Sequence, residues 1–413
     1  MHTSKLKASK ISMVLIIIGL LLTESQAADL TDEPGQQLVN TYCTACHNTG
    51  RIKHGLGYDA DDWLALSQSM IDLSAVPEQR DQLIEYLATH YPPNDDRKPN
   101  LVSGDATINF KEWVVPTLGQ RSRDPVEDAH GNIWWVGQWG DTLGRIDPKT
   151  DAMKEYGLPS GAKPHSVTIG PDNSVWYTGN KNGTMGLLNP ETGDIKEYPM
   201  PDPVAKDPHT AVFDQDGLLW FTLQQSNKVG RLNRETEEIK LVDMPTERSR
   251  PYGIKVAENG DIYVACNGSN CLVKLDPKTM ATTEIKLPHA DTHVRRLDID
   301  STGKIWYVNS GRGRLGVYNP ANGEIKEWPS PSGPKSHPYA LAVIDDVVWY
   351  NESGMRPDPL VRFDPKTETF QSWPIPSGSF YAGIARHIRP TQDGNLLIHQ
   401  SATNRIILVE IGD

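Results

Sequence analysis

The sequence predicts a multidomain chain: a small all-α domain followed by an all-β seven-bladed propeller whose N-terminal strand closes the last blade. Residues 28–91 carry apolar residues at helical spacing, which favours helices. Beyond residue 100, a short apolar strand recurs seven times, about 42–49 residues apart, which is the period of four-stranded propeller blades. A second element ending in proline also recurs seven times, and its first copy precedes the first strand.

The chain begins with a predicted signal peptide at residues 1–27. Lys5, Lys7 and Lys10 precede an apolar run at residues 11–22, and Ser25-Gln26-Ala27 forms a small-x-small cleavage site. An uncleaved anchor is the alternative, but the run is shorter than the roughly 20 residues that span a bilayer. No cysteine lies near the site to carry a lipid. We therefore expect a periplasmic or secreted protein with no stable membrane anchor after cleavage.

Three helices are predicted within the first domain, residues 28–91. The first covers residues 35–46, and the second covers residues 61–73, where Trp63, Leu66 and Met70 follow helical spacing. The third covers residues 76–91. The proline-rich, charged stretch at residues 92–100 then separates this domain from the propeller as a linker.

Cys43, Cys46 and His47 form Cys-x-x-Cys-His, the attachment motif of c-type haem. The two thiols can form thioethers to one porphyrin, and His47 then becomes an axial ligand of the iron. The motif predicts one covalently bound haem c.

Met70 is the methionine that falls between residues 28 and 100, and a thioether opposite histidine is the usual electron-transfer ligation, so Met70 is the expected sixth ligand. The alternatives are His54, His90, an open position, or ordinary core packing of Met70. The first helix, the motif, the methionine and a last helix containing Tyr86 and Leu87 together resemble the class I cytochrome c domain.

Charge narrows the classes of partner. The formal net charge is −12, and residues 1–27 carry three lysines against Glu24, so the mature chain carries about −14. A protein this acidic will not bind nucleic acid non-specifically, whereas a basic redox partner protein would be steered towards it.

The propeller, residues 101–413, is predicted from its two repeats. The strand repeat occupies residues 133–135, 175–177, 219–221, 262–264, 305–307, 348–350 and 396–398. The second repeat is clearest at residues 195–201, 325–331 and 370–376. Its copy at residues 110–116 stands before the first blade, and none follows residue 411, so the N-terminal copy should complete the last blade. Closure would remove the exposed sheet edges of an open array.

The repeat resembles that of the virginiamycin B lyase (streptogramin lyase) family of seven-bladed propellers. The resemblance rests on the Gly-x-Leu/Ile-Trp-Phe/Tyr strand, on residues 228–232 (Lys-Val-Gly-Arg-Leu) and on residues 197–199 (Glu-Tyr-Pro). It covers roughly 300 residues, and it identifies the blade type rather than the activity.

One position per blade should face the central channel. Counting back from each strand repeat gives three histidines, three arginines and a tyrosine: Arg123, His165, His209, Tyr252, Arg295, His337 and Arg386. Such a ring suits a small anionic or oxygen-rich ligand, or a metal. The alternative is that these side chains hydrogen-bond neighbouring blades as scaffold.

The lyase resemblance implies roles for two blades. Residues 163–165 (Lys-Pro-His) and 207–209 (Asp-Pro-His) look like that family's histidine pair. By resemblance, His209 and His165 are the tentative catalytic residues, with His209 as general base and Asp207 helping to hold a divalent cation. The following hairpin carries Gln224 and Gln225, where an acidic or imidazole ligand would be expected.

Three functions follow from these features. The first is a periplasmic monohaem electron-transfer protein whose propeller binds a substrate or redox partner. The second is an elimination lyase of the streptogramin type with an accessory cytochrome. The third is a non-catalytic propeller that positions the cytochrome. Whether the chain is an enzyme is left open.

Two further cysteines, Cys266 and Cys271, flank an Asn-Gly turn, which favours a hairpin with the two sulfurs facing each other. In an oxidising compartment this arrangement predicts a disulfide. A metal site or a redox-active pair is the alternative.

Overall fold

The computed structural model describes residues 33–44, 49, 52, 57–93, 97–378 and 385–412. The signal peptide predicted at residues 1–27 lies outside these ranges, as do Cys46, His47 and His54. Within these ranges, no helix combines the length and the apolar character needed to cross a membrane.

A small helical domain precedes the propeller. It holds a short helix, α1(Pro34–Leu38), continued by one π-helical turn, η1(Val39–Cys43), and two longer helices, α3(Ala60–Gln68) and α4(Pro77–His90). Asp59 caps α3 by accepting a hydrogen bond from the Asp62 amide at 2.8 Å. Helix α1 packs on α4 at Gly35, where any Cβ would overlap the Tyr86 side chain, so this close crossing requires glycine.

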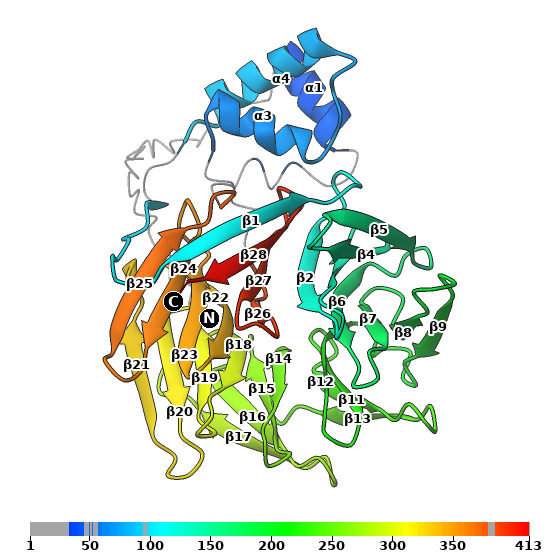
Figure 1. Cartoon of the computed structure of the whole chain (residues 1–413), viewed down its shortest axis with the longest axis vertical. Coiled ribbons are helices and arrows are strands. Elements are labelled where there is room, and N and C mark those ends of the chain that lie inside the picture. Colours follow the sequence, from blue (N-terminus) through cyan, green and yellow to red (C-terminus); the bar gives the residue numbers. More distant parts are fainter. Residues whose placement is uncertain are drawn as a thin grey trace, which may run out of the picture.

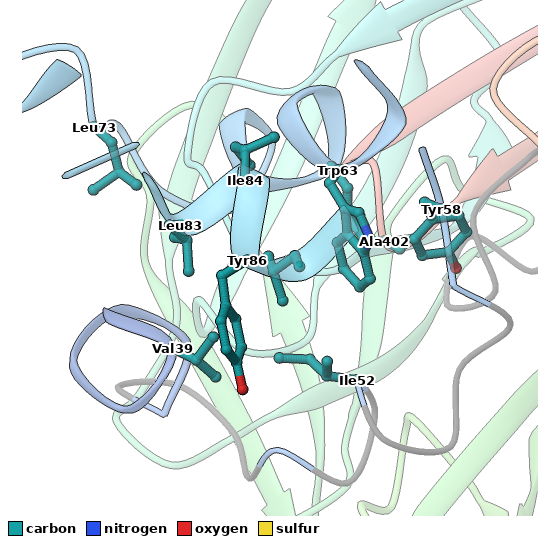
Figure 2. Close-up of a cluster of buried hydrophobic side chains, with 11 residues drawn as sticks. Val39, Ile52, Tyr58, Trp63, Leu73, Leu83, Ile84, Tyr86 and Ala402 are labelled. Carbon is teal, nitrogen blue, oxygen red and sulfur yellow. The ribbon is translucent and has the colours of Figure 1, made fainter. Parts of the chain in front are cut away.

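The helices enclose one apolar core, which extends onto the propeller. Trp63, Leu83 and Leu87 are buried in it. Figure 2 shows Val39 next to the Tyr86 ring in the same cluster. Ala402, a propeller residue more than 300 positions away in the chain, belongs to the same cluster. The two domains therefore share a hydrophobic contact.

The described residues of the propeller form seven four-stranded antiparallel sheets (Figure 1), so the predicted seven-bladed fold is confirmed. We number the blades in chain order. Blade 1 holds β2(Ser122–Glu127), β3(Ile133–Gly137), β4(Thr142–Asp147) and β5(Ala152–Gly157). Blade 2 holds β6(Pro164–Ile169), β7(Val175–Gly179), β8(Thr184–Leu188) and β9(Ile195–Pro199). Blade 3 holds β10(Pro208–Phe213), β11(Leu219–Leu223), β12(Lys228–Leu232) and β13(Ile239–Asp243).

The remaining blades continue the pattern. Blade 4 holds β14(Pro251–Val256), β15(Ile262–Cys266), β16(Cys271–Leu275) and β17(Thr282–Lys286). Blade 5 holds β18(Val294–Ile299), β19(Ile305–Asn309), β20(Arg314–Tyr318) and β21(Ile325–Pro329). Blade 6 follows the 3-10 turn η3(Gly333–Lys335) and holds β22(Pro338–Ile344), β23(Val347–Glu352), β24(Pro359–Asp364) and β25(Thr369–Pro374). Blade 7 holds β26(Arg389–Pro390), β27(Leu396–Gln400), β28(Arg405–Ile411) and the early strand β1(Ile108–Val114).

Strand β1 closes the ring, as its position before the first blade predicts. It pairs antiparallel with β28 from Ile108 opposite Ile411 to Val114 opposite Arg405. Figure 1 shows the two strands side by side next to the helical domain.

Aromatic side chains of the second strand of each blade fill the space between strands and blades. The third strand carries a glycine directly opposite several of these rings: a Cβ at Gly144 would overlap Trp135, and one at Gly230 would overlap Phe221. In three blades the indole nitrogen of the repeated tryptophan donates to the aspartate of the preceding turn, as from Trp220 to Asp214 at 2.7 Å. The turn residue and the aromatic strand are therefore linked physically as well as in sequence.

The helical domain docks where the chain enters blade 1. The Ser69 hydroxyl donates to the Ala402 carbonyl at 2.9 Å, and the Gly119 amide donates to the Ser69 carbonyl at 3.0 Å. Gly119 lies between β1 and β2, and Ala402 lies in the hairpin between β27 and β28. Met70, next to Ser69, is therefore held close to the segment that leads into the first inner strand.

Candidate functional site

The first strands of the blades line the central channel, and their registers define one equivalent position. It is the residue after the strand's first paired residue: Pro208 faces Leu223 and precedes His209, and Pro251 faces Cys266 and precedes Tyr252. In blade 7 the same position, counted from Arg389, is Arg386. We call these seven residues the channel ring: Arg123, His165, His209, Tyr252, Arg295, Tyr339 and Arg386.

One predicted ring position is wrong. His337 was expected in blade 6, but the register places Tyr339 there, because Pro338 pairs with Glu352. The hairpin between β22 and β23 turns through Asp345 and Asp346, both with positive φ (49° and 64°), so it is a tight two-residue turn. The ring residue of blade 6 is therefore closer in sequence to the repeated strand at residues 348–350 than the ring residues of other blades are to theirs. The prediction assumed that it was further away. His337 itself holds Ser353 Oγ at 2.9 Å through Nδ1.

Four ring side chains form a continuous row. The rings of His165 and His209 lie 3.5 Å apart between centroids, and His209 lies 4.1 Å from Tyr252. The hydroxyls of Tyr252 and Tyr339 are in hydrogen-bond contact at 2.5 Å. All four side chains are buried, so side chains from blades 2, 3, 4 and 6 meet within the channel.

A β-bulge lets some inner strands contribute two consecutive residues. The register shifts directly after the ring residue in blade 1, between Arg123 and Val126, and around the ring residue in blades 2 to 6. In a regular strand, successive side chains would point to opposite faces, and a bulge changes that direction. Asp124 and Arg296 thus also face the channel, although each directly follows a ring residue.

Arg296 crosses the channel beneath the row. Its guanidinium donates to the Arg386 carbonyl and to Thr210 Oγ1, both at 3.0 Å, and lies 5.0 Å from the Tyr252 ring centroid. It also approaches Asp124 Oδ2 at 3.7 Å. One side chain therefore ties blade 5 to blades 1, 3, 4 and 7.

Asp124 is the buried anion at the centre of this arrangement. Its carboxylate lies 3.4 Å from Arg123 Nε and 3.2 Å from His387 Nδ1. Burial alone would raise its pKa, but Arg123, His387 and Arg296 outweigh burial and hold the pKa well below its usual value. Asp124 therefore stays ionised at neutral pH.

The two histidines of the row are neutral. Burial is the main cause that lowers the pKa of His165 and His209 well below 6.5, and the nearby arginines lower it further. His165 Nδ1 lies 3.1 Å from the His209 carbonyl, which can only accept, so that nitrogen carries the proton. The Nε2 atom of His165 is then an available base or ligand.

The ring carries more positive than negative charge. Arg123 and Arg296 are buried, whereas Arg295 and Arg386 are half-buried and mark the side from which solvent reaches the ring. Within the described part of the chain, Arg123 Nη2, Arg295 Nε and Arg296 Nη2 are buried without a hydrogen-bond partner. Such nitrogens are costly unless a ligand supplies an acceptor.

Asp207 makes structural contacts within blade 3. Its carboxylate accepts hydrogen bonds from the Gln225 and Ser226 amides and from Ser226 Oγ, which fixes the turn between β11 and β12. No group of three or more His, Cys, Asp or Glu side chains suited to a metal occurs among the residues that the structure describes.

The two propeller cysteines lie at the same end of blade 4. Cys266 ends β15 and Cys271 begins β16, and in the structure both are buried free thiols. The two residues stand at facing ends of adjacent strands, and Ser269 Oγ lies 3.1 Å from Cys271 Sγ. This juxtaposition would allow oxidation to a disulfide, which stays a prediction.

Two residues predicted to bind haem are described, and both lie in the helical domain. Cys43 ends η1 and Met70 follows α3, and both pack against the domain's single apolar core. Burial raises the pKa of Cys43 to about 11. His90, an alternative ligand, pairs instead with Glu33 at 3.2 Å and stacks on Tyr86.

Sequence reasoning missed Asp124, Arg296, His387 and Tyr339. A signal for Tyr339 was present, since Pro-His or Pro-Tyr opens the inner strand in blades 2, 3, 4 and 6. Aligning the blades on that proline would have selected Tyr339. Nothing in the alternation of apolar and polar residues indicates the bulges that turn Asp124 and Arg296 towards the channel.

Comparison with known proteins supports the blade type. Residues 106–275 match the model of the virginiamycin B lyase family. No curated protein matches the chain.

Solved structures with a similar fold include lyases of low sequence identity. Virginiamycin B lyase from Staphylococcus aureus is 21% identical with a TM-score of 0.66, covering 74% of this chain and 99% of its own. A streptogramin B lyase is 20% identical with a TM-score of 0.67, covering 74% and 98%. A catalytically inactive histidine-to-alanine variant of the Staphylococcus aureus enzyme, solved with quinupristin, is 23% identical with a TM-score of 0.64, covering 73% and 99%. At these identities the likeness establishes the fold.

The buried neutral histidines predict acid sensitivity. His165, His209, His387 and His399 all have pKa values well below 6.5 in the folded chain, mainly because of burial. The unfolded chain binds protons below about pH 6.5 while the folded chain does not, so stability falls as pH drops through that value. Each histidine contributes up to about 1.4 kcal/mol per pH unit to this slope.

Urea unfolding followed by tryptophan fluorescence, between about pH 7 and pH 5, measures the effect. In the double variant His165→Gln/His209→Gln, the slope of unfolding free energy against pH should fall by up to about 2.8 kcal/mol per unit. The control is His130→Gln, a change at an exposed turn. An unchanged slope in the double variant would show that these histidines are not buried as neutral groups.

Proposed function

We propose that this chain is a periplasmic electron-transfer protein in which a c-type haem domain serves a propeller that binds a small anionic or oxygen-rich ligand at the channel ring. The observation that carries the ligand proposal is the set of buried guanidinium nitrogens without acceptors on Arg123, Arg295 and Arg296. The haem proposal rests on the Cys-x-x-Cys-His motif and on the fit of the helical domain.

The described residues of the helical domain fit a covalently held haem. Cys43 and Met70 lie on one small apolar core, as the attachment and distal sides of one porphyrin require. Cys43 and Cys46 would hold the haem covalently, and His47 and Met70 would bind its iron. When bound, the haem would supply one-electron transfer, and the apolar core would exclude water from it.

The contact between the helical domain and the propeller supports a functional link between the haem domain and the channel ring. Ser69, beside Met70, hydrogen-bonds to Ala402 and receives the Gly119 amide. Gly119 lies four residues before the ring residue Arg123 in the segment that leads into β2. A short stretch of ordered backbone thus links the distal-ligand loop to the channel ring.

The channel ring suits an anion with several acceptor oxygens. Arginine presents several N–H groups in a planar fork, so it binds carboxylates, sulfate and phosphate by paired hydrogen bonds. The neutral histidines and the tyrosine hydroxyls can each donate or accept a further hydrogen bond. Uncompensated buried positive charge is expensive, so binding an anion would remove a cost as well as form contacts.

The haem assignment predicts a covalent chromophore when the chain is produced with cytochrome maturation machinery. Met70→Ala should keep the covalent haem but lower its reduction potential and alter its reduced spectrum, because the thioether ligand that raises the potential is lost. Met153→Ala, a change at a half-buried propeller methionine, is the matched control. Absence of covalent haem, or an unchanged spectrum and potential in Met70→Ala, would contradict the assignment.

The ring assignment predicts anion binding by the full-length chain. Calorimetry with sulfate and oxalate should show binding that Arg295→Gln weakens by roughly 10- to 100-fold, the loss expected for one hydrogen bond to a charged group. Arg234→Gln removes an arginine that pairs with Asp172 on the outer surface, and it should bind both anions normally. Equal affinity in the two variants would exclude the ring as the binding site.

A second candidate is an elimination lyase of the streptogramin type, which the family match over residues 106–275 favours. The stacked, neutral pair of His165 and His209 supplies a base for such a reaction. Incubation of the full chain with quinupristin would then give a ring-opened product, and His209→Ala should abolish it. Full turnover by His209→Ala would remove His209 from the reaction, and no turnover by the native chain would exclude this substrate.

A further inference from the structure

The contact between the Tyr252 and Tyr339 hydroxyls is a feature of the channel ring that neither proposed function explains. The two phenols come from blades 4 and 6, and their hydroxyls meet at 2.5 Å across blade 5. Both side chains are buried, with 3% and 7% exposure. A tyrosine pair in hydroxyl contact inside a ring of arginines needs a chemical explanation.

Tyr339 has the more positive surroundings of the two phenols. The Arg295 guanidinium lies 4.5 Å from the centre of its ring, and that of Arg386 lies 5.9 Å away. Among the described residues, Tyr252 is the only hydrogen-bond partner of the Tyr339 hydroxyl. If Tyr252 donates, the Tyr339 oxygen accepts, and its own proton has no acceptor.

These surroundings separate the two phenols in acidity. Burial alone would raise the pKa of Tyr339, but Arg295, Arg386 and the hydrogen bond from Tyr252 outweigh burial and lower it to about 8. Burial and the neighbouring Tyr339 raise the pKa of Tyr252 to about 12. A pair of groups pushed apart in this way can hold one proton and release the other near neutral pH.

We propose that Tyr339, with Tyr252 as its hydrogen-bond donor, is a proton-exchanging group that couples anion binding at the channel ring to proton uptake. This inference rests on the proposed anion site. Above about pH 8, the Tyr339 phenolate of the empty ring balances part of the arginine charge. An anion that binds Arg295 takes over this role, so Tyr339 takes one proton from solvent and becomes a neutral phenol.

The coupling follows from the charges that face Tyr339. The groups around it are Tyr252 from β14, Arg295 and Arg296 from β18, Arg386 of blade 7, Arg123 from β2, and His337 ahead of β22. His337 is neutral because burial lowers its pKa to about 4. Among these groups the Tyr339 phenol is the one whose pKa lies near 8.

The first test is a pH titration of tyrosinate absorbance in the near ultraviolet, on the full-length chain without added anions. One tyrosine should ionise near pH 8. Tyr339→Phe should remove this transition. Tyr252→Phe, which keeps Tyr339 but removes its donor, should raise the midpoint and provides a readout if Tyr339→Phe is unstable. Tyr198→Phe, on the outer strand β9, is the control and should leave the transition unchanged.

The second test adds sulfate, whose own charge is constant over this range. Saturating sulfate should raise the midpoint by about one pH unit or more, and sulfate affinity should fall about tenfold per pH unit above the midpoint. In Tyr339→Phe the affinity should be independent of pH. If sulfate binds but neither midpoint nor affinity responds to pH, the proton coupling is overturned and the anion site stands. If sulfate binds at no pH, the anion site is overturned and this inference with it.

Discussion

The pairing of β1 with β28 is the constraint on which the other features depend. In the sequence, β1 precedes the strands of all the blades. A seven-residue antiparallel ladder joins it to β28, the last strand of the propeller. This ladder removes the free sheet edges of an open array. It also fixes the two segments that touch the helical domain, because Gly119 follows β1 and Ala402 precedes β28. Ring closure and domain docking therefore depend on the same strand pair, and the loop that holds Met70 cannot be placed independently of the ring.

The chemistry of the channel comes from irregular backbone within regular strands. The inner strands of blades 1 to 6 all shift register near the ring position. In blade 5 this places both Arg295, which faces Tyr339, and Arg296, which crosses to Thr210 and Asp124, in the channel. The repeated scaffold supplies equivalent places, and in blades 1, 3 and 5 a second consecutive residue takes part in the channel contacts. That is how a structure of seven similar units can hold an asymmetric constellation of charges.

Most of the propeller could be predicted because its signals are local and repeated. Strand aromatics, turn aspartates and outer prolines recur at a fixed period, and the phase of the two repeats revealed the closing strand. The ring was harder to predict from sequence, because its members depend on the length of each inner hairpin. The short turn at Asp345 and Asp346 places Tyr339 at the ring position, where the sequence analysis predicted His337. Asp124 and Arg296 lay beyond sequence reasoning, since a bulge leaves no trace in hydrophobic alternation. The haem assignment rests on a motif whose Cys46 and His47 lie outside the described residues, so the structure bears on it through Cys43 and Met70.

Charge balance at the ring gives these features a common physical basis. The chain as a whole is acidic, at −12, so long-range attraction of an anion is weak, and salt screens charges beyond about 10 Å. Recognition must therefore arise at short range, from buried guanidinium groups whose remaining N–H groups seek acceptors. Asp124 neutralises part of this charge permanently, while the histidines contribute none because burial keeps them neutral. We propose that the remaining charge is balanced by a bound anion or, above about pH 8, by the Tyr339 phenolate. We expect a site organised in this way to favour oxyanions over halides, because an oxyanion can accept several N–H groups at once while the tyrosine pair adjusts its proton to the charge of the ligand.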